Sequence, residues 1–395
     1  MKATKVIKKF LRKVGIEISN YNPIFSMECI SLDPDNGYKG SVLLSLWVEP
    51  FLSEVGEPVS NAHSHSWTSL QIAKTFLESG YHVDVVDYRN KSFVPEKDYA
   101  FFVAFRTNFE RISKLLNNDC IKIVYLDTAH WLFNNHETFK RGLALQERKG
   151  ITLTGLRIIE TNMAIEYADY AIITANRFTL RTYEYAKKPL FRLPFPTCST
   201  YPWPEAKNHA SCRKNFLWFG SAGFVHKGLD LVLDAFAELP DCHLYVCGPI
   251  QSERDFEEAY RKELYQTPNI HTPGWVDVEG TEFIEITNKC IALIYPSCSE
   301  GGGGSAITCM QAGLIPVVSY EASVDVEDFG IILKESSIET IRQAIQMIST
   351  MPAEQLRIMS RKAWEHTRLH HTRERFAEGF RRVVDQVTTD RQPGK

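Results

Sequence analysis

The chain of 395 residues lacks several features that would define a function at once. Its nine cysteines are scattered, none forms a CxxC pair and their number is odd, which argues against a zinc site and a disulfide framework. No apolar run reaches the roughly 18–20 residues of a membrane span, and no apolar segment of a secretion signal follows the basic N-terminus. The net charge is only −3, which disfavours nucleic acid as a partner. We therefore expect a cytoplasmic protein with reduced, mostly buried thiols.

The N-terminus is the one strongly basic segment. Residues 1–13, MKATKVIKKFLRK, contain six Lys or Arg side chains and no acid, and their apolar residues share one helical face. This pattern is compatible with an amphipathic helix on an anionic membrane surface, which would make the protein peripheral at the inner face of the membrane. A solvated, frayed N-terminus is the equally simple alternative, because short isolated helices are marginal in water.

From residue 41 onward, short apolar runs alternate with helical patterns. Such alternation predicts parallel sheets covered by helices on both faces. A proline-rich stretch between about 194 and 212 has almost no periodicity and reads as a linker, after which the alternation restarts. The predicted strands are 41–48, 82–88, 99–105, 121–126, 170–174, 215–219, 243–247, 290–296 and 314–319.

These patterns predict an α/β protein with two Rossmann-like domains. The expected organisation is a basic extension (1–40), a first α/β domain (41–195), a linker (196–212), a second α/β domain (213–360) and a helical tail (361–395) that packs back on the first domain. Ligands of such sheets bind at the carboxyl ends of the strands, and here also in the crevice between the domains.

Four consecutive glycines, Gly301 to Gly304, lie between Glu300 and a predicted helix. A helix N-terminus has unpaired N–H groups and the positive end of a dipole. Glycine lets this backbone approach a ligand closely. A strand, a glycine loop and a helix in succession favour a diphosphate cradle over a flexible surface turn. The spacing is neither that of a Walker A loop nor a GxGxxG motif after a first strand.

A second glycine-bearing strand end precedes an amphipathic helix. Gly220 directly follows the run 215–219, and Lys227 with Gly228 opens the helix. Lys227 would place a point charge on a phosphate, although a lysine at a helix start is commonly just solvated. Two such strand ends in one domain favour the phosphate-binding interpretation.

These residues resemble the group 1, family-four retaining glycosyltransferases, which have the GT-B fold of two facing Rossmann-like domains. The family has a Gly-Arg strand end, a Lys-Gly helix start, a Pro-Ser turn, and two glutamates eight positions apart around a glycine loop. Gly220, Lys227–Gly228, Pro296–Ser297 and Glu300 match this pattern. The chain departs from this pattern at two positions. Ser221 stands where the family has arginine, and Thr308 stands where the family has the second glutamate.

The resemblance implies a nucleotide-sugar donor in the second domain. Because no DxD-like motif is placed at the end of a predicted strand, we expect transfer that is independent of metal and needs no cofactor. Lys227 would neutralise the diphosphate together with the backbone of the glycine loop, and Glu300 would face the donor sugar. Thr308 would lie near the ribose, and His226 would replace the missing arginine at the phosphates. The implied donor-binding residues are Gly220, Ser221, His226, Lys227, Gly248, Trp275, Gly301, Gly302, Gly303, Gly304, Ser305 and Thr308.

The first domain holds one candidate catalytic residue and four candidates for the acceptor side. The resemblance assigns His130 to the donor sugar, as a catalytic residue with Lys227 and Glu300; simple packing beside Trp131 is the alternative. The four acceptor-side candidates are Asp127, Arg106, His63 and His65. Asp127 and Arg106 follow predicted strands, as do His63 and His65, which have no third metal ligand nearby. The acceptor is expected to be a glycan or a lipid-linked sugar in surface-polysaccharide or lipopolysaccharide synthesis. A catalytically inactive binding module and a nucleotide-sugar epimerase stay open as alternatives.

Overall fold

The computed structural model describes residues 29–52 and 64–390, which form two compact units. The first unit contains the described residues up to 131 together with 160–198 and 371–390. The second unit contains residues 132–159 and 199–370. The chain therefore passes from one unit to the other four times. Residues 132–159, which the sequence prediction placed with the first domain, fold with the second sheet. The basic segment 1–13 and His63 lie outside the described residues.

The first unit is built on a seven-stranded sheet in which only the edge strand β1 is antiparallel. Two apolar clusters cover the sheet, and the interior strand β2 (Ser41–Leu46) is buried along its whole length. The spatial order of the strands is β1 (Ile30–Leu32), β3 (His82–Asp87), β2, β4 (Phe101–Phe105), β5 (Ile121–Leu126), β6 (Tyr170–Ile173) and β7 (Leu190–Arg192).

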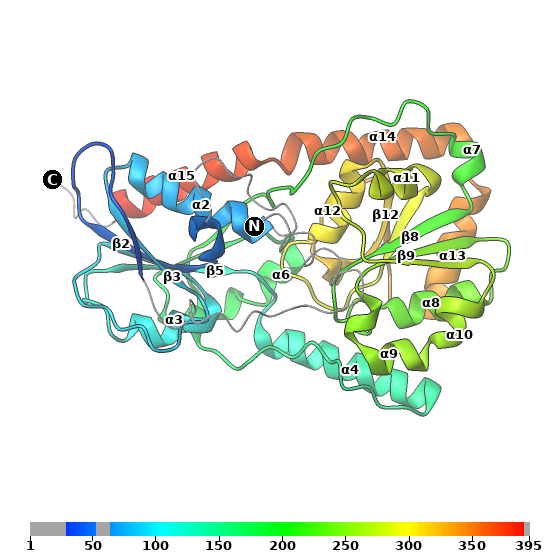
Figure 1. Cartoon of the computed structure of the whole chain (residues 1–395), viewed down its shortest axis with the longest axis horizontal. Helices are drawn as coiled ribbons and strands as arrows, with labels where there is room; N and C mark the ends of the chain where they lie inside the picture. Colours follow the sequence, from blue (N-terminus) through cyan, green and yellow to red (C-terminus); the bar gives the residue numbers. More distant parts are fainter. Residues whose placement is uncertain (1–28, 53–63, 391–395) are drawn as a thin grey trace. The chain divides into compact units, whose positions relative to one another are not determined.

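The C-terminal helix α15 (Arg373–Asp390) completes this unit by packing along α2 (Ser64–Glu78) (Figure 1). The rings of Phe76 and Phe380 lie 5.9 Å apart, as do those of Trp67 and Phe376. The other helices of the unit are η2 (Glu49–Leu52), α3 (Arg106–Ser113), α5 (Ala164–Tyr167), α6 (Arg177–Arg181) and η3 (Glu184–Ala186).

The second unit is built on a six-stranded, fully parallel sheet. Its core includes Leu145 and Leu153 from the first half of the chain. The spatial order of the strands is β10 (Ile270–Gly274), β9 (His243–Cys247), β8 (Asn215–Phe219), β11 (Ala292–Tyr295), β12 (Ile315–Ser319) and β13 (Ile331–Leu333). The two strands that precede the predicted phosphate loops, β8 and β11, are neighbours at the centre of this sheet.

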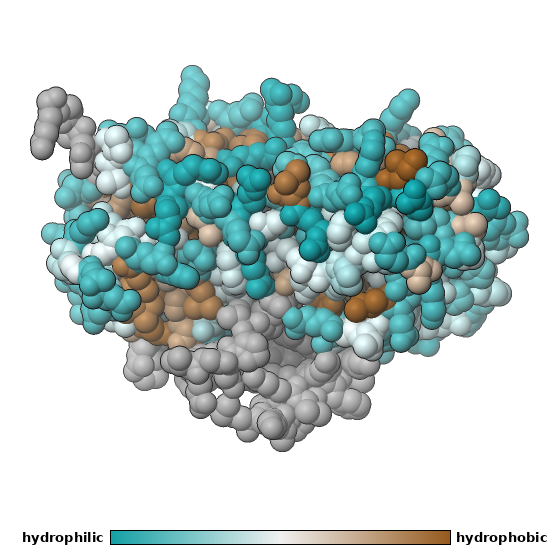
Figure 2. Space-filling model, turned by 90° about the horizontal axis from the view of Figure 1, so that it is seen from above, coloured by the Kyte–Doolittle hydropathy of each residue, from teal (hydrophilic) through white to brown (hydrophobic). Residues whose placement is uncertain are grey.

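Helices surround the second sheet. They are α4 (Trp131–Lys149), α7 (His209–Cys212), α8 (Leu229–Ala237), η4 (Ile250–Ser252), α9 (Arg254–Ala259), α10 (Arg261–Gln266), α11 (Thr281–Lys289), α12 (Gly304–Gln311), η5 (Tyr320–Ala322), α13 (Ile338–Thr350) and α14 (Ala353–His370). None of the helices in the described part of the chain combines the length and apolar character needed to cross a membrane. Figure 2 shows a largely hydrophilic face with scattered apolar side chains.

Candidate donor site at the ends of two central strands

Two strand-to-helix connections of the second unit meet because β8 and β11 are parallel neighbours. After β8 the chain runs through Gly220 and reaches α8 at Gly228, whose φ is 70°. After β11 it runs through Glu300 and reaches α12 at Gly303, whose φ is 60°. Left-handed backbone of this kind is strained for residues with a Cβ. The first N–H groups of α12 therefore follow a turn that glycine makes accessible.

Lys227 and Glu300 form the centre of the site. Lys227 Nζ donates to Glu300 Oε1 at 2.6 Å and to the Tyr295 hydroxyl oxygen at 2.8 Å. The Tyr295 hydroxyl and the Ser297 hydroxyl also donate to Glu300 Oε1, at 2.7 and 3.0 Å. The Lys227 side chain is 3% exposed and that of Glu300 12%. Two side chains 73 positions apart in the sequence thus form an ion pair that is nearly buried.

Burial and charge set the protonation of this pair. Burial lowers the pKa of Lys227 to about 8, against the attraction of Glu300. Burial raises the pKa of Glu300, but the positive charges of Lys227 and Arg157 outweigh it and hold the pKa below the ordinary range of a glutamate. At neutral pH the pair therefore consists of an ammonium and a carboxylate.

His226 is engaged on both ring nitrogens inside the protein. Nε2 lies 2.6 Å from the Ser299 carbonyl oxygen and Nδ1 lies 2.8 Å from the Thr138 hydroxyl oxygen. The residue is 2% exposed, and burial, aided by the positive charge of Arg157, lowers its pKa to about 3. This arrangement corrects the expectation that His226 faces the phosphates, since its ring ties the Lys227 loop to Ser299 and to α4.

Residues 132–159 lie against both loops. Arg141 Nη2 donates to the Pro296 carbonyl at 2.6 Å, and Arg157 Nη1 lies 3.6 Å from Glu300 Oε2. The methylene Cδ of Arg157 is 3.2 Å from where a Cβ of Gly223 would be. Arg148 fastens α4 to α8 through Asp230 at 2.7 Å and Asp234 at 2.9 Å. In Figure 1 α4 runs beside α8 and α9.

Glu253 binds backbone N–H groups in the loop that joins β8 to α8. Its carboxylate accepts from the backbone N–H groups of Gly223 and Phe224. Burial raises the pKa of Glu253, against these two hydrogen bonds. The outer part of this loop is thus held by a carboxylate of the same unit, whereas Ser221 before it is exposed.

The other predicted donor residues are also at strand ends of the second unit. Gly248 follows β9, and a Cβ there would lie 2.5 Å from the Gly220 carbonyl oxygen, so only glycine permits this approach. Trp275 follows β10 and is partly exposed. Thr308, in the second turn of α12, is 6% exposed, and its hydroxyl donates to the Gly304 carbonyl at 2.9 Å. Along the glycine run, Gly301 and Gly303 are buried, and Gly302, Gly304 and Ser305 are partly exposed.

In the first unit, three of the four predicted residues that are described gather after β4 and β5. The guanidinium of Arg106 pairs with the carboxylate of Asp127. His130 is buried, and its Nε2 lies 2.9 Å from the hydroxyl oxygen of Tyr185, which donates to Glu166. Burial lowers the pKa of His130. His65 instead packs in an aromatic cluster, 4.9 Å from the ring of Phe105.

Sequence reasoning missed Tyr295, Thr138, Glu253 and Arg157. Tyr295 is simply the last residue of a buried strand, and the other three lie in helical or loop segments without a motif. Within the described ranges, no three or more His, Cys, Asp or Glu side chains are grouped to hold a metal ion.

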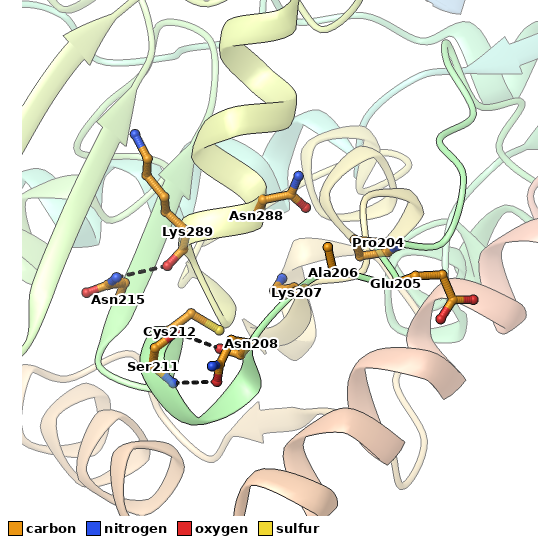
Figure 3. Close-up of a pocket in the computed structure, with 10 residues that line it drawn as sticks. All are labelled: Pro204, Glu205, Ala206, Lys207, Asn208, Ser211, Cys212, Asn215, Asn288 and Lys289. Carbon is orange, nitrogen blue, oxygen red and sulfur yellow. Dashed lines mark hydrogen bonds between the residues drawn. The ribbon is translucent and has the colours of Figure 1, made fainter.

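A surface hollow of the second unit lies elsewhere, at the amino end of β8 (Figure 3). Asn215 opens β8 and donates to the Lys289 carbonyl at 2.9 Å. Nearby, the buried Lys207 donates to the carbonyls of Thr287 and Gly313 at 3.0 and 3.2 Å. Parallel sheets bind ligands at the opposite, carboxyl end, so we assign this hollow no part in the site.

Comparison with solved structures shows that the chain has the GT-B fold, as the sequence resemblance implied. Sucrose-phosphate synthase from Thermosynechococcus elongatus superimposes with a TM-score of 0.62 at 14% identity, over 90% of this chain and all of that one. Anabaena Alr3699/HepE in complex with UDP and glucose gives 0.53 at 11% identity, over 89% and 99%. WaaG, a glycosyltransferase involved in lipopolysaccharide biosynthesis, gives 0.51 at 14% identity, over 87% and 99%.

A comparison with protein-family models covers part of the second unit. Residues 205–366 match the family model described as "Glycosyl transferases group 1". The matched residues contain both loops of the site, from Gly220 to Thr308. No curated protein sequence matches the chain.

Proposed function

We propose that the protein transfers a sugar from a nucleoside diphosphate sugar to a hydroxyl group of an acceptor, with retention at the anomeric carbon. The observation that carries this proposal is the buried Lys227–Glu300 pair, 2.6 Å apart, beside the glycine-rich start of α12. An ammonium and helix N–H groups stabilise a departing diphosphate. A carboxylate next to them accepts hydrogen bonds from sugar hydroxyls.

The reaction requires mostly positioning. The bond between the anomeric carbon and the diphosphate breaks, the acceptor oxygen forms the new bond, and the acceptor proton leaves on the diphosphate. Lys227 would stabilise the negative charge that develops on the departing oxygen. His130 would hydrogen-bond the donor sugar, and Arg106 with Asp127 would contact the acceptor. Neither a bound metal nor a cofactor is part of this proposal.

The proposed donor and the proposed biological context are taken from solved proteins of similar fold. A uracil nucleotide is the first donor to test, because a protein of similar fold was solved with UDP and glucose. Surface-glycan or lipopolysaccharide synthesis is the proposed context, since WaaG is of similar fold. The basic residues 1–13 would bring the enzyme to an anionic membrane at the cytoplasmic side.

A thermal-shift panel of UDP-, GDP-, ADP- and dTDP-sugars tests the proposal. At least one donor is expected to raise the melting temperature of the wild type, and Lys227→Met is expected to abolish that shift. Lys214→Ala is the matched control, because Lys214 is an exposed lysine just before β8, at its opposite end. An unchanged shift in Lys227→Met would contradict the phosphate role of Lys227.

An inactive binding module is the second candidate. It is favoured by Ser221 in place of an arginine and by Thr308, whose hydroxyl is already bonded to its own helix. Donor binding without transfer or hydrolysis across a panel of glycan and lipid-linked acceptors would establish it. Conversion of the donor sugar without any acceptor would instead indicate an epimerase.

A further inference from the structure

The loop after β8 lacks the guanidinium that the group 1 pattern has at position 221, but another arginine lies against this loop. Arg157 comes from the segment that follows α4. Its Cδ lies 3.2 Å, and its Cβ 3.5 Å, from the position that a Cβ of Gly223 would take. With φ at 94°, Gly223 offers a surface on which the Arg157 stem can rest. A guanidinium is thus supplied to the same loop by a different part of the chain.

The ion pair of Arg157 with Glu300 is longer than that of Lys227 with Glu300. Arg157 Nη1 lies 3.6 Å from Glu300 Oε2, beyond a good hydrogen bond, whereas Lys227 Nζ lies 2.6 Å from Oε1. The Arg157 side chain is 40% exposed, against 3% for Lys227. Lys227 also donates to Tyr295. Of the two cations, Arg157 is the one that can turn toward an anion without breaking a short internal hydrogen bond.

The backbone that presents Arg157 is well anchored to α4. Asn134 Nδ2 donates to the Arg157 carbonyl at 3.1 Å. The Asn135 amide bonds both the N–H and the carbonyl of Ile159, each at 2.9 Å. Thr154 donates to Asp255 through its N–H and its hydroxyl, at 2.6 and 2.7 Å. The main chain on both sides of Arg157 is therefore fixed, while its guanidinium stays solvated.

We propose that Arg157 binds the diphosphate of the nucleotide donor and takes the place of the guanidinium absent at Ser221. The inference rests on the proposed function, because it assumes that a nucleoside diphosphate occupies the loop. A guanidinium can make two parallel hydrogen bonds to phosphate oxygens, which lysine and serine cannot. In this scheme Lys227 and Arg157 share the charge of the diphosphate, and Glu300 lies between them.

The test is calorimetric titration of the full-length protein with UDP, GDP, ADP and dTDP, and with the monophosphate and nucleoside of whichever binds. Arg157→Gln is expected to weaken the diphosphate about ten- to hundredfold, the range for hydrogen bonds to charged groups. It should weaken the nucleoside little. The control Arg254→Gln removes an exposed arginine at the start of α9 and is expected to bind as the wild type. Melting curves without nucleotide show whether each variant is folded.

The rescue variant Ser221→Arg in the Arg157→Gln background tests the replacement itself. Ser221 is exposed, so the longer side chain needs no cavity. Recovery of diphosphate affinity is expected, and its absence overturns the claim that Arg157 stands in for position 221. Undiminished diphosphate binding by Arg157→Gln, or equal loss for the nucleoside and the diphosphate, overturns the phosphate contact while the proposed function stands. If none of the four diphosphates binds the wild type, the proposed function falls and the inference falls with it.

Discussion

The Nδ1 atom of His226 lies 2.8 Å from the hydroxyl oxygen of Thr138, a residue 88 positions earlier in the chain. The other ring nitrogen lies 2.6 Å from the Ser299 carbonyl oxygen. Nε2–H donates to the Ser299 carbonyl, and in the neutral imidazole Nδ1 is an acceptor that faces the Thr138 hydroxyl, which also lies 2.7 Å from the Asn134 carbonyl oxygen. One buried ring thus joins α4, the loop 220–228 that contains Lys227 and the loop 296–303 that contains Glu300.

His226 should make folding sensitive to acid. Its folded pKa of about 3 is below the ordinary value of 6.5, so between these values the unfolded chain binds a proton that the folded protein does not. The stability from this residue is therefore lost as pH falls below 6.5. The advantage of the wild type over His226→Gln in urea unfolding should shrink by about 1–2 kcal/mol between pH 7 and 5. The exposed His136 on α4 gives the control, His136→Gln. A constant advantage across this range would contradict the prediction.

Lys227 should make diphosphate binding fall at alkaline pH. Its pKa of about 8 means that the ammonium loses its proton as pH rises above 8, whereas the diphosphate is fully charged above pH 7. The affinity of the wild type for the bound diphosphate, measured by titration calorimetry, should drop about tenfold between pH 7 and 9.5. Lys227→Met should bind weakly with no such drop. An equal decline in both proteins would assign the effect to another group.

Removal of Arg148 should loosen α4 from the second unit. Asp230 is 1% exposed and its carboxylate would be left buried without its closest cation. Burial already raises the pKa of Asp230. Arg148→Met should cost about 3–5 kcal/mol of unfolding free energy, as for a broken buried pair. Arg357→Met, which breaks an exposed pair with Glu354 on α14, should leave the unfolding free energy nearly unchanged, because solvent screens that pair. Similar losses in both variants would mean that the Arg148 contacts do not hold α4.

Gly228 and Gly274 both have positive φ, and comparing them separates the cost of backbone strain from the cost of steric crowding. A Cβ at Gly228 would lie 2.7 Å from both Cγ and the carbonyl oxygen of Pro296, whereas one at Gly274 would meet nothing within 4 Å. Gly274→Ala should therefore cost only about 1–2 kcal/mol for left-handed backbone, and Gly228→Ala about 3 kcal/mol or more because overpacking is added. Equal melting temperatures of the two variants would show that the Pro296 turn yields.

The sequence predicted those parts of the fold and site that depend on local pattern. Strand ends carry recognisable residues, so Lys227, Glu300 and the glycine loop were placed on the correct elements before their side chains were known to meet. The role of residues 132–159 had no such signal. Their helical periodicity predicts an apolar face but not which sheet it covers. That choice depends on Arg148 meeting Asp230, 82 residues further on, and on Leu145 joining the core of the second unit. Arg157 was missed for the same reason, and the phosphate role assigned to His226 conflicted with contacts that only packing reveals.

The exchange of segments between the two units has a consequence during synthesis. Residues 132–159 leave the ribosome before any strand of the sheet that they cover, and at ordinary translation rates they wait on the order of tens of seconds for its last strand. The first unit likewise waits for Phe376 and Phe380, which follow its last strand by more than 180 residues. Neither half of the sequence, expressed alone, contains all the segments of a unit, so a nascent chain interrupted near residue 198 would expose the apolar sides of both α2 and α4.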